Sequence, residues 1–201
     1  ACGTGSTLRA ISARLPARQH WRLVDNDLDL LARAGALARP PLLLVMPRPV
    51  DLARDLELAL EAPVDLVATS ALLDLVSAKW LDRLVTETAA RRLPVYAALS
   101  YDGRAEIAPR EPLDDEVLAG VNRHQRTDKG FGPALGPNAA AHARARFDHV
   151  GYVVVEGRSD WVMGPQDRKI QEQILAGWAQ AAVEIGALST LQSATWLTAR
   201  R

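Results

Sequence analysis

The first residues of the chain have the types and spacing of a ligand-binding loop. The stretch "ACGTGS" places Gly3 and Gly5 on either side of one threonine. Such glycines let the backbone turn tightly and leave amide N–H groups facing outward, and a helix predicted to begin here adds its partial positive end. This combination suits a nucleotide-like ligand, although a short Gly-Thr-Gly turn is also compatible with a purely structural role.

An acidic residue further along the chain strengthens the ligand interpretation. Asp25 ends the apolar stretch "HWRLVD", about 20 residues after the glycine loop. A carboxylate at that spacing can accept hydrogen bonds from both hydroxyls of an adenosine ribose. The alternative is that Asp25 only caps the next helix, with Asn26 and Asp27 competing for that role. The loop and Asp25 together favour an adenosyl ligand.

Two classes of cofactor use this arrangement, and Leu8 bears on the choice between them. A dinucleotide fingerprint has a third glycine where the helix packs closely against the strand. Counted from Gly3 and Gly5, that glycine would fall at position 8, which is leucine. The sequence therefore disfavours NAD or FAD, and a nicotinamide-dependent oxidoreductase stays as an alternative.

At this point the sequence resembles the class I S-adenosylmethionine-dependent methyltransferases. Their first motif commonly reads acidic-x-Gly-x-Gly-x-Gly. Its later part is matched by Cys2, Gly3, Thr4 and Gly5, and Ala1 stands where the first glycine is usual. The motif's acidic residue would lie outside this sequence. The resemblance implies that the loop from Ala1 to Gly5 binds S-adenosylmethionine.

The resemblance continues at the ends of later predicted strands. It implies that Asp25, with Asn26 beside it, contacts the ribose hydroxyls of the cofactor. It also implies that Asp51 accepts a hydrogen bond from the adenine amino group and that Leu52 lies against the ring.

The methyl-transfer chemistry is expected near the end of the stretch "VDLVATS". The resemblance implies that the methionine end of the cofactor and the acceptor meet at Thr69 and Ser70. Asp74 lies just beyond, and His124 lies in the polar stretch "VNRHQRTDKGFGP", so both are candidate catalytic groups that could take a proton from the acceptor. The structural alternative for Asp74 is a carboxylate that pairs with a helix cap or an arginine. The structural alternative for His124 is an exposed histidine on a helix.

A small set of residues could hold the acceptor itself. Tyr101 ends another predicted strand, "PVYAALSY". Arg123, Arg126 and Lys129 form a basic segment that could clamp a carboxylate or phosphate, or simply be a solvated face.

The elements that must position these residues alternate between strand-like and helical patterns. Strands are predicted at "HWRLVDND", "LLLVMPRPVDL", "VDLVATS", "PVYAALSY" and "YVVVEG", the last extended or paired by residues 159–163. The prolines of the second stretch place it near a sheet edge. Alternation of this kind predicts a parallel α/β sheet. The resemblance implies a Rossmann-like three-layer sandwich with a mostly parallel central sheet.

Helices are predicted between these strands. Ser77 is expected to cap a helix that buries Trp80, Leu81, Leu84 and Val85, and Pro137 is expected at a first helical position. A long helix from Pro165 to about Gly186 places an apolar stripe on one side, formed by Ile170, Ile174, Leu175, Trp178 and Ile185.

The sequence is expected to cover one methyltransferase-like domain over residues 1–201. In that fold a central strand precedes the glycine loop, and a last antiparallel strand follows the final helices. Neither is readable between Ala1 and Arg201. We therefore expect the domain to be represented without its first strand, and its last strand is not visible either.

The amino-acid composition limits the classes of binding partner that we expect. Lys+Arg and Asp+Glu both number 24, so the balanced charge gives no reason to expect nucleic acid or a membrane. The single cysteine, Cys2, suits a reducing cytosol, and no spacing predicts a metal site.

The sequence thus predicts a cytoplasmic S-adenosylmethionine-dependent methyltransferase acting on a small or medium-sized acceptor. A non-catalytic subunit that binds the adenosyl cofactor for a partner is the alternative outside enzymology. The identity of the acceptor and the oligomeric state stay open.

Overall fold

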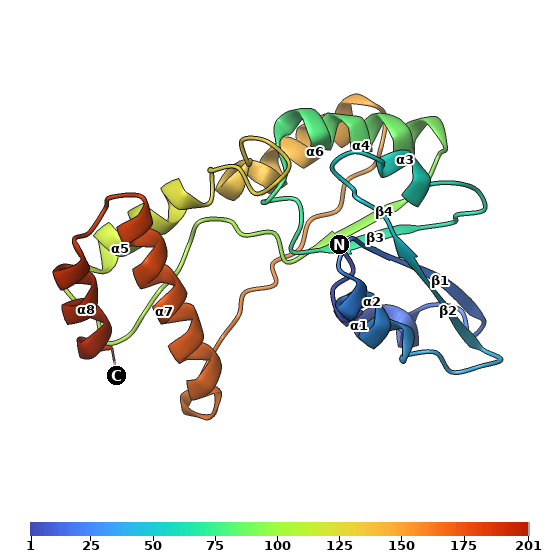
Figure 1. Cartoon of the computed structure of the whole chain (residues 1–201). Coiled ribbons are helices and arrows are strands. Elements are labelled where there is room, and N and C mark those ends of the chain that lie inside the picture. Colours follow the sequence, from blue (N-terminus) through green and yellow to red (C-terminus); the bar gives the residue numbers. More distant parts are fainter. Residues whose placement is uncertain (201) are drawn as a thin grey trace.

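The computed structural model describes residues 1–200 and shows a mixed α/β chain with two small parallel sheets (Figure 1). The strands are β1 (Gln19–Asp25), β2 (Leu43–Pro49), β3 (Val67–Ser70) and β4 (Val95–Ala98). The α-helices are α1 (Ser6–Ile11), α2 (Leu28–Gly35), α3 (Leu56–Ala59), α4 (Ala78–Ala90), α5 (Asp114–His124), α6 (Ala139–His149), α7 (Arg168–Glu184) and α8 (Thr190–Ala199). Short 3₁₀ turns are η1 (Ser12–Arg14), η2 (Gly136–Asn138) and η3 (Pro165–Asp167).

The sheet arrangement differs from the single mostly parallel sheet that was predicted. Within residues 1–200, β1 pairs only with β2 and β3 pairs only with β4, both in parallel. The four strands that the apolar runs predicted at these positions are confirmed. Their joining into one sheet is not seen, because no described strand lies between β1 and β3.

The β1–β2 pair and its helices form one buried cluster. The register runs from Gln19 opposite Leu43 to Asp25 opposite Pro49. Leu8 of α1 packs against Leu23 of β1, together with residues of α2. The predicted edge position of the proline-rich strand is confirmed within the described residues, since β2 has one neighbour.

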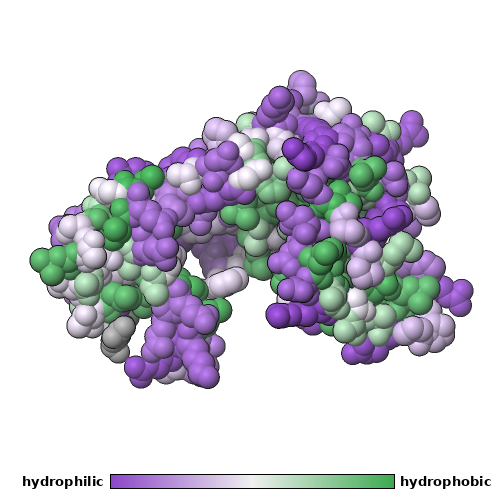
Figure 2. Space-filling model, viewed as in Figure 1, coloured by the Kyte–Doolittle hydropathy of each residue, from purple (hydrophilic) through white to green (hydrophobic). Residues whose placement is uncertain are grey.

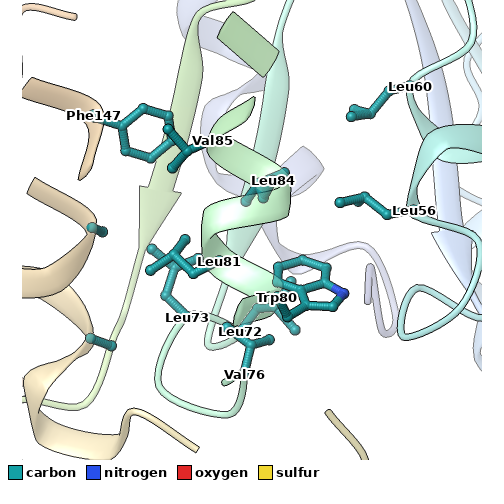
Figure 3. Close-up of a cluster of buried hydrophobic side chains, with 12 residues drawn as sticks. Leu56, Leu60, Leu72, Leu73, Val76, Trp80, Leu81, Leu84, Val85 and Phe147 are labelled. Carbon is teal, nitrogen blue, oxygen red and sulfur yellow. The ribbon is translucent and has the colours of Figure 1, made fainter. Parts of the chain in front are cut away.

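The largest buried cluster surrounds α4 (Figure 3). Ser77 caps this helix as predicted, because its hydroxyl accepts a hydrogen bond from Trp80 N at 3.2 Å. The cluster contains the four apolar residues predicted on this helix and its neighbours, namely Leu56, Leu60, Leu72, Leu73, Val76, Trp80, Leu81, Leu84, Val85 and Phe147. In Figure 3, Trp80 and Leu84 face the side of Leu56, and Val85 lies beside Phe147 of α6.

A separate cluster holds α5, α7 and α8 together, away from the two sheets in Figure 1. Trp196 of α8 is 2% exposed, and its indole N–H donates to Asp114 of α5 at 2.8 Å. Arg200 binds the same carboxylate. Of the predicted α7 stripe, Leu175 and Trp178 pack on this cluster, whereas Ile170 is 40% exposed.

The strand predicted at "YVVVEG" is wrong in this structure. Residues 152–163 have no regular secondary structure. Tyr152 and Val154 pack on the α4 cluster, while Val153 and Val155 are 93% and 88% exposed. The alternation typical of a strand is therefore present, but the segment has no pairing partner.

The surface is mixed in hydropathy on the face drawn in Figure 2, with an open gap between the α5–α7–α8 part and the part that holds the sheets. Within residues 1–200, no helix combines the length and the apolar character required to cross a bilayer.

Candidate functional site

The glycine loop turns as the sequence predicts, but most of its N–H groups bind within the protein. Gly3 and Gly5 have φ angles of 52° and 79°, in the left-handed region that favours glycine. However, Cys2 N donates to Val24 O at 2.8 Å and Gly5 N donates to Cys2 O at 2.9 Å. The prediction that these amides face outward to a ligand is therefore wrong. The loop needs them to fix its own shape at the end of β1.

Gly5 is favoured by its φ angle, and a Cβ there would also push the end of the Leu37 side chain. A Cβ at this position would lie 2.5 Å from Leu37 Cδ1. Gly3, in contrast, has nothing within 4 Å of the place that a Cβ would occupy, and Ala1 is exposed. The loop therefore has one packed side, at Gly5, and one open side, at Gly3.

Asp25 joins the glycine loop to the end of β1. Its Oδ2 accepts a hydrogen bond from Gly3 N at 2.9 Å, and its Oδ1 accepts one from Asp27 N at 3.2 Å. The side chain is 6% exposed. Asp25 is not the cap of the next helix, because Asp27 caps α2 by accepting hydrogen bonds from Asp29 N and Leu30 N. Asn26 is exposed beside them.

The two predicted adenine contacts, Asp51 and Leu52, follow the end of β2. Asp51 Oδ1 accepts from Ala53 N at 3.0 Å, which forms a local turn. Leu52 O accepts from the Trp80 indole at 2.7 Å. Val50 N donates to Asp25 O at 3.0 Å, so the ends of β1 and β2 are held together.

The start of α1 also touches the end of β3. Thr7 Oγ1 and Ser70 Oγ are 2.8 Å apart. Thr69, the preceding residue, is buried, and its Oγ1 has no hydrogen-bond partner among the described residues. The structure therefore brings the glycine loop, Asp25 and Ser70 to the carboxyl ends of β1 and β3, the edge at which α/β proteins bind ligands.

Asp74 follows β3 and is the most unusual polar group of the chain. It is 6% exposed, and its Oδ1 has no hydrogen-bond partner among the described residues. Burial raises the pKa of this carboxyl above its ordinary value, and the backbone N–H groups of Asp74 and Tyr101 offset part of that rise. Among residues 1–200, Asp74 neither caps a helix nor has an arginine partner.

The loop after α5 holds Asp74 in place. Gly136 N donates to Asp74 O at 2.9 Å, and Leu135 N donates to Val76 O at 2.8 Å. Gly136 has a φ of 52°, and a Cβ there would lie 3.1 Å from Gln125 O. Gln125 Oε1 is buried and has no hydrogen-bond partner among the described residues.

Tyr101 acts differently from the predicted acceptor contact. Its hydroxyl donates to Asn122 Oδ1 at 2.8 Å, and its ring packs on the cluster of α5, α7 and α8. Burial, followed by the charge of Asp102, raises the pKa of Tyr101 to about 12. Its side chain therefore links the segment after β4 to α5.

His124 and Lys129 form a group at the end of α5. His124 Nε2 lies 3.0 Å from Glu184 Oε2 of α7, and its Nδ1 lies 3.3 Å from Lys129 Nζ. Lys129 Nζ also donates to Thr127 Oγ1 at 3.0 Å. The Gln180 amide, and then His124, lower the pKa of Glu184. Both ring nitrogens of His124 thus have protein partners.

The two arginines predicted to bind the acceptor are exposed on the same helix region. Arg126 donates to Asn122 O at 3.2 Å, and Arg123 lies on the solvent side of α5. Their assignment to acceptor binding stays a prediction.

The residues at this edge of the two sheets fit an adenosyl group in two respects. At Gly3, the place that a Cβ would occupy has no atom within 4 Å. Asp25 uses its two oxygens for one backbone hydrogen bond each, which leaves lone pairs for two further donors such as the ribose hydroxyls. Within residues 1–200, no group of three or more His, Cys, Asp or Glu side chains could hold a metal ion.

Comparison with known proteins gives no relative from which to assign a function. No protein-family model matches the chain, and no match was found among curated proteins or solved structures.

Sequence reasoning missed Gly136, whose N–H group donates to the backbone carbonyl of Asp74, and Asn122, whose side chain accepts from the Tyr101 hydroxyl. It also missed Gln125, whose backbone lies against Gly136. Asn122 and Gln125 lie in the polar stretch that contains His124, and Gly136 follows it. The density of polar residues and glycine was the available signal, but the contacts themselves depend on the fold.

Proposed function

We propose that this chain is a methyltransferase domain that binds S-adenosylmethionine at the carboxyl ends of β1, β2 and β3. The observation that carries the proposal is the Asp25 carboxylate. It is buried, is held by Gly3 of the glycine loop, and keeps acceptor capacity for a pair of hydroxyls. The resemblance of "ACGTGS" to the first motif of these enzymes and the order of Asp25, Asp51 and Ser70 support the same proposal.

The proposed fold is the Rossmann-like sandwich to which the two sheets would belong. β1, β2, β3 and β4 are all paired in parallel. The loop from Cys2 to Thr7 connects both sheets, since Cys2 N binds Val24 O and Thr7 binds Ser70. A strand between β1 and β3 would complete a mostly parallel central sheet and satisfy both free edges.

When bound, S-adenosylmethionine supplies a methyl group already activated on a sulfonium. The protein then has to orient the acceptor, exclude water and receive a proton where the acceptor atom carries one. Asp25 orients the cofactor through the ribose, and the Thr7–Ser70 pair fixes the loop beside β3.

Asp74 is the candidate that we propose for receiving the proton. It is a buried carboxylate at the ends of β3 and β4, and its pKa is raised by burial. Where the acceptor atom carries a proton, Asp74 Oδ1 would receive it as the methyl group is transferred from the sulfonium. His124 is the weaker candidate, since both of its ring nitrogens have partners.

The proposal is tested by calorimetric titration with S-adenosylhomocysteine. Asp25→Asn should weaken binding at least about tenfold, the loss expected when hydrogen bonds to a charged group are removed. Asp27→Asn is the matched control, because asparagine caps a helix as well as aspartate does. Equal affinity of the Asp25→Asn variant and the unmodified chain would refute the ribose assignment.

A further inference from the structure

His124 lies between an anion and a cation at the end of α5. Its Nε2 is 3.0 Å from Glu184 Oε2 of α7, and its Nδ1 is 3.3 Å from Lys129 Nζ in the segment that follows α5. Its neighbours in sequence, Arg123 and Arg126, are exposed and form no hydrogen bond with the ring. The His124 side chain is 26% exposed, so protons from solvent can reach it.

The two partners determine which ring nitrogen carries the hydrogen. The Lys129 ammonium group donates hydrogen bonds and accepts none. Glu184 also accepts a hydrogen bond from Gln180 Nε2 at 2.7 Å, as an ionised carboxylate does. His124 therefore accepts at Nδ1 and donates at Nε2, which describes a neutral ring with its hydrogen on Nε2.

Protonation of the His124 ring changes one of these contacts and keeps the other. The added proton occupies Nδ1, so this nitrogen can no longer accept from Lys129, and two positive groups would stand 3.3 Å apart. The contact with Glu184 remains and becomes an ion pair between α5 and α7. Histidine is the side chain that makes this change of charge near neutral pH.

Lys129 belongs to residues 127–136, a segment that connects the end of α5 with the loop after β3. At the far end of the segment, Gly136 N donates to Asp74 O at 2.9 Å, a backbone contact that involves no titrating group. Near its start, the contact between Lys129 and His124 holds the segment against α5. The segment therefore has one anchor that is independent of pH and one that depends on the charge of His124.

We propose that His124 is a pH-sensitive latch for residues 127–136. The neutral ring binds Lys129 and keeps the segment against α5, whereas the protonated ring releases Lys129 and keeps Glu184. Because the far anchor is the backbone of Asp74, the latch controls a segment that ends beside the loop after β3. The latch does not depend on the proposed function.

NMR spectroscopy of the full chain tests the latch. Long-range ¹⁵N–¹H spectra at about pH 8, above the range in which histidines titrate, should show the hydrogen of His124 on Nε2. The reporters of the segment are Gly130 N and Gly132 N, which donate to Asp128 Oδ1 at 2.7 and 3.0 Å. As pH is lowered, the two glycine signals should shift with the same midpoint as the His124 ring, and their heteronuclear NOE should fall.

His124→Gln is the most informative variant, because its amide N–H can donate to Glu184 and its amide oxygen can accept from Lys129 at any pH. The pH response of the two glycine signals should disappear in this variant. Lys129→Met removes the cation, so the His124 ring should titrate at a higher pH than in the unmodified chain. His149→Gln is the matched control, since His149 is exposed at the end of α6 and should leave the response intact.

Three results would overturn the inference: a hydrogen on Nδ1 of His124 above its titration range, glycine signals that do not follow the ring, or an unchanged pH response in His124→Gln. An unchanged midpoint of the ring in Lys129→Met would also overturn it, because the two side chains would then not interact. The tautomer and the pH response are measured on the unmodified chain, so the test stands even if a variant does not fold.

Discussion

Asp25 and Asp74 are both buried acids at the carboxyl ends of parallel strands, yet their surroundings differ in one decisive way. Each side chain is 6% exposed. Asp25 receives hydrogen bonds from Gly3 N and Asp27 N, whereas Asp74 keeps one oxygen without a partner. The Asp25 carboxylate stabilises the glycine loop, whereas Asp74 Oδ1 has no hydrogen-bond donor among the described residues.

This difference separates structural from ligand-dependent roles. A buried charge with backbone donors stabilises the fold around it, while one without a partner costs stability that a ligand can return. Asp25 binds the loop in the structure, and its proposed second role is to bind the ribose.

Replacing Asp25 by alanine should give the largest loss of stability. The variant leaves Gly3 N and Asp27 N without their acceptor, so the free energy of unfolding should fall by about 2–3 kcal/mol. Chemical denaturation followed by circular dichroism measures it. If Asp25→Ala lowered the free energy of unfolding no more than the exposed-site variant Asp102→Ala, the structural role of Asp25 would be contradicted.

The glycine loop offers the next test. Gly5→Ala should lower the free energy of unfolding by about 1–2 kcal/mol, because alanine is strained at a φ of 79° and would approach Leu37. Gly177, in the interior of α7 with open space around it, is the opposite case. Gly177→Ala should raise stability by about 0.5–1 kcal/mol, and a loss in both variants would contradict the account.

Asp74→Asn should raise stability at neutral pH by up to about 1 kcal/mol, since it removes a buried charge without a partner. The folded-state pKa of Asp74 is raised, so the folded chain holds a proton that the unfolded chain has released. The stability of the unmodified chain should therefore fall as pH rises from the ordinary carboxyl value through the raised one. The gain from the variant should shrink as pH is lowered across this window. Denaturation at several pH values measures the free energy of unfolding of both proteins. A stability gain that does not change with pH would contradict its assignment to the Asp74 charge.

His124→Gln should have the smallest effect on stability, within about 0.5 kcal/mol, because its contact with Glu184 is largely exposed. Once an acceptor is known, methyl transfer by this variant should match that of the unmodified chain. A loss of turnover with unchanged cofactor affinity would return His124 to the mechanism.

Much of the local structure could be predicted from the sequence. The runs "HWRLVD" and "VDLVATS" are β1 and β3 because apolar residues with few breaks form buried strands, and Ser77 caps α4 because its hydroxyl precedes a helical pattern. The pairing of strands could not be predicted in the same way. Residues 152–155 alternate between packed and exposed side chains, as in a strand, but the segment pairs with no described strand, and pairing is not specified by the period of the sequence.

The candidate site was predicted only in outline. Asp25 and Asp74 were found because acids after apolar runs stand at strand ends. The internal hydrogen bonds of the glycine loop and the closeness of Gly136 to both Asp74 and Gln125 depend on tertiary contacts between distant segments. No spacing in the sequence specifies those contacts.

The central claim, an adenosyl site that begins with the glycine loop and Asp25, is tested most directly by thermal unfolding of the full chain with S-adenosylhomocysteine, run beside NAD. A ligand at about 100 times its dissociation constant adds roughly 2.7 kcal/mol to the folded state. The account predicts a saturable rise in Tm with S-adenosylhomocysteine, none with NAD, and loss of the rise in Asp25→Asn. A rise with NAD alone, or no rise with either compound, would contradict it.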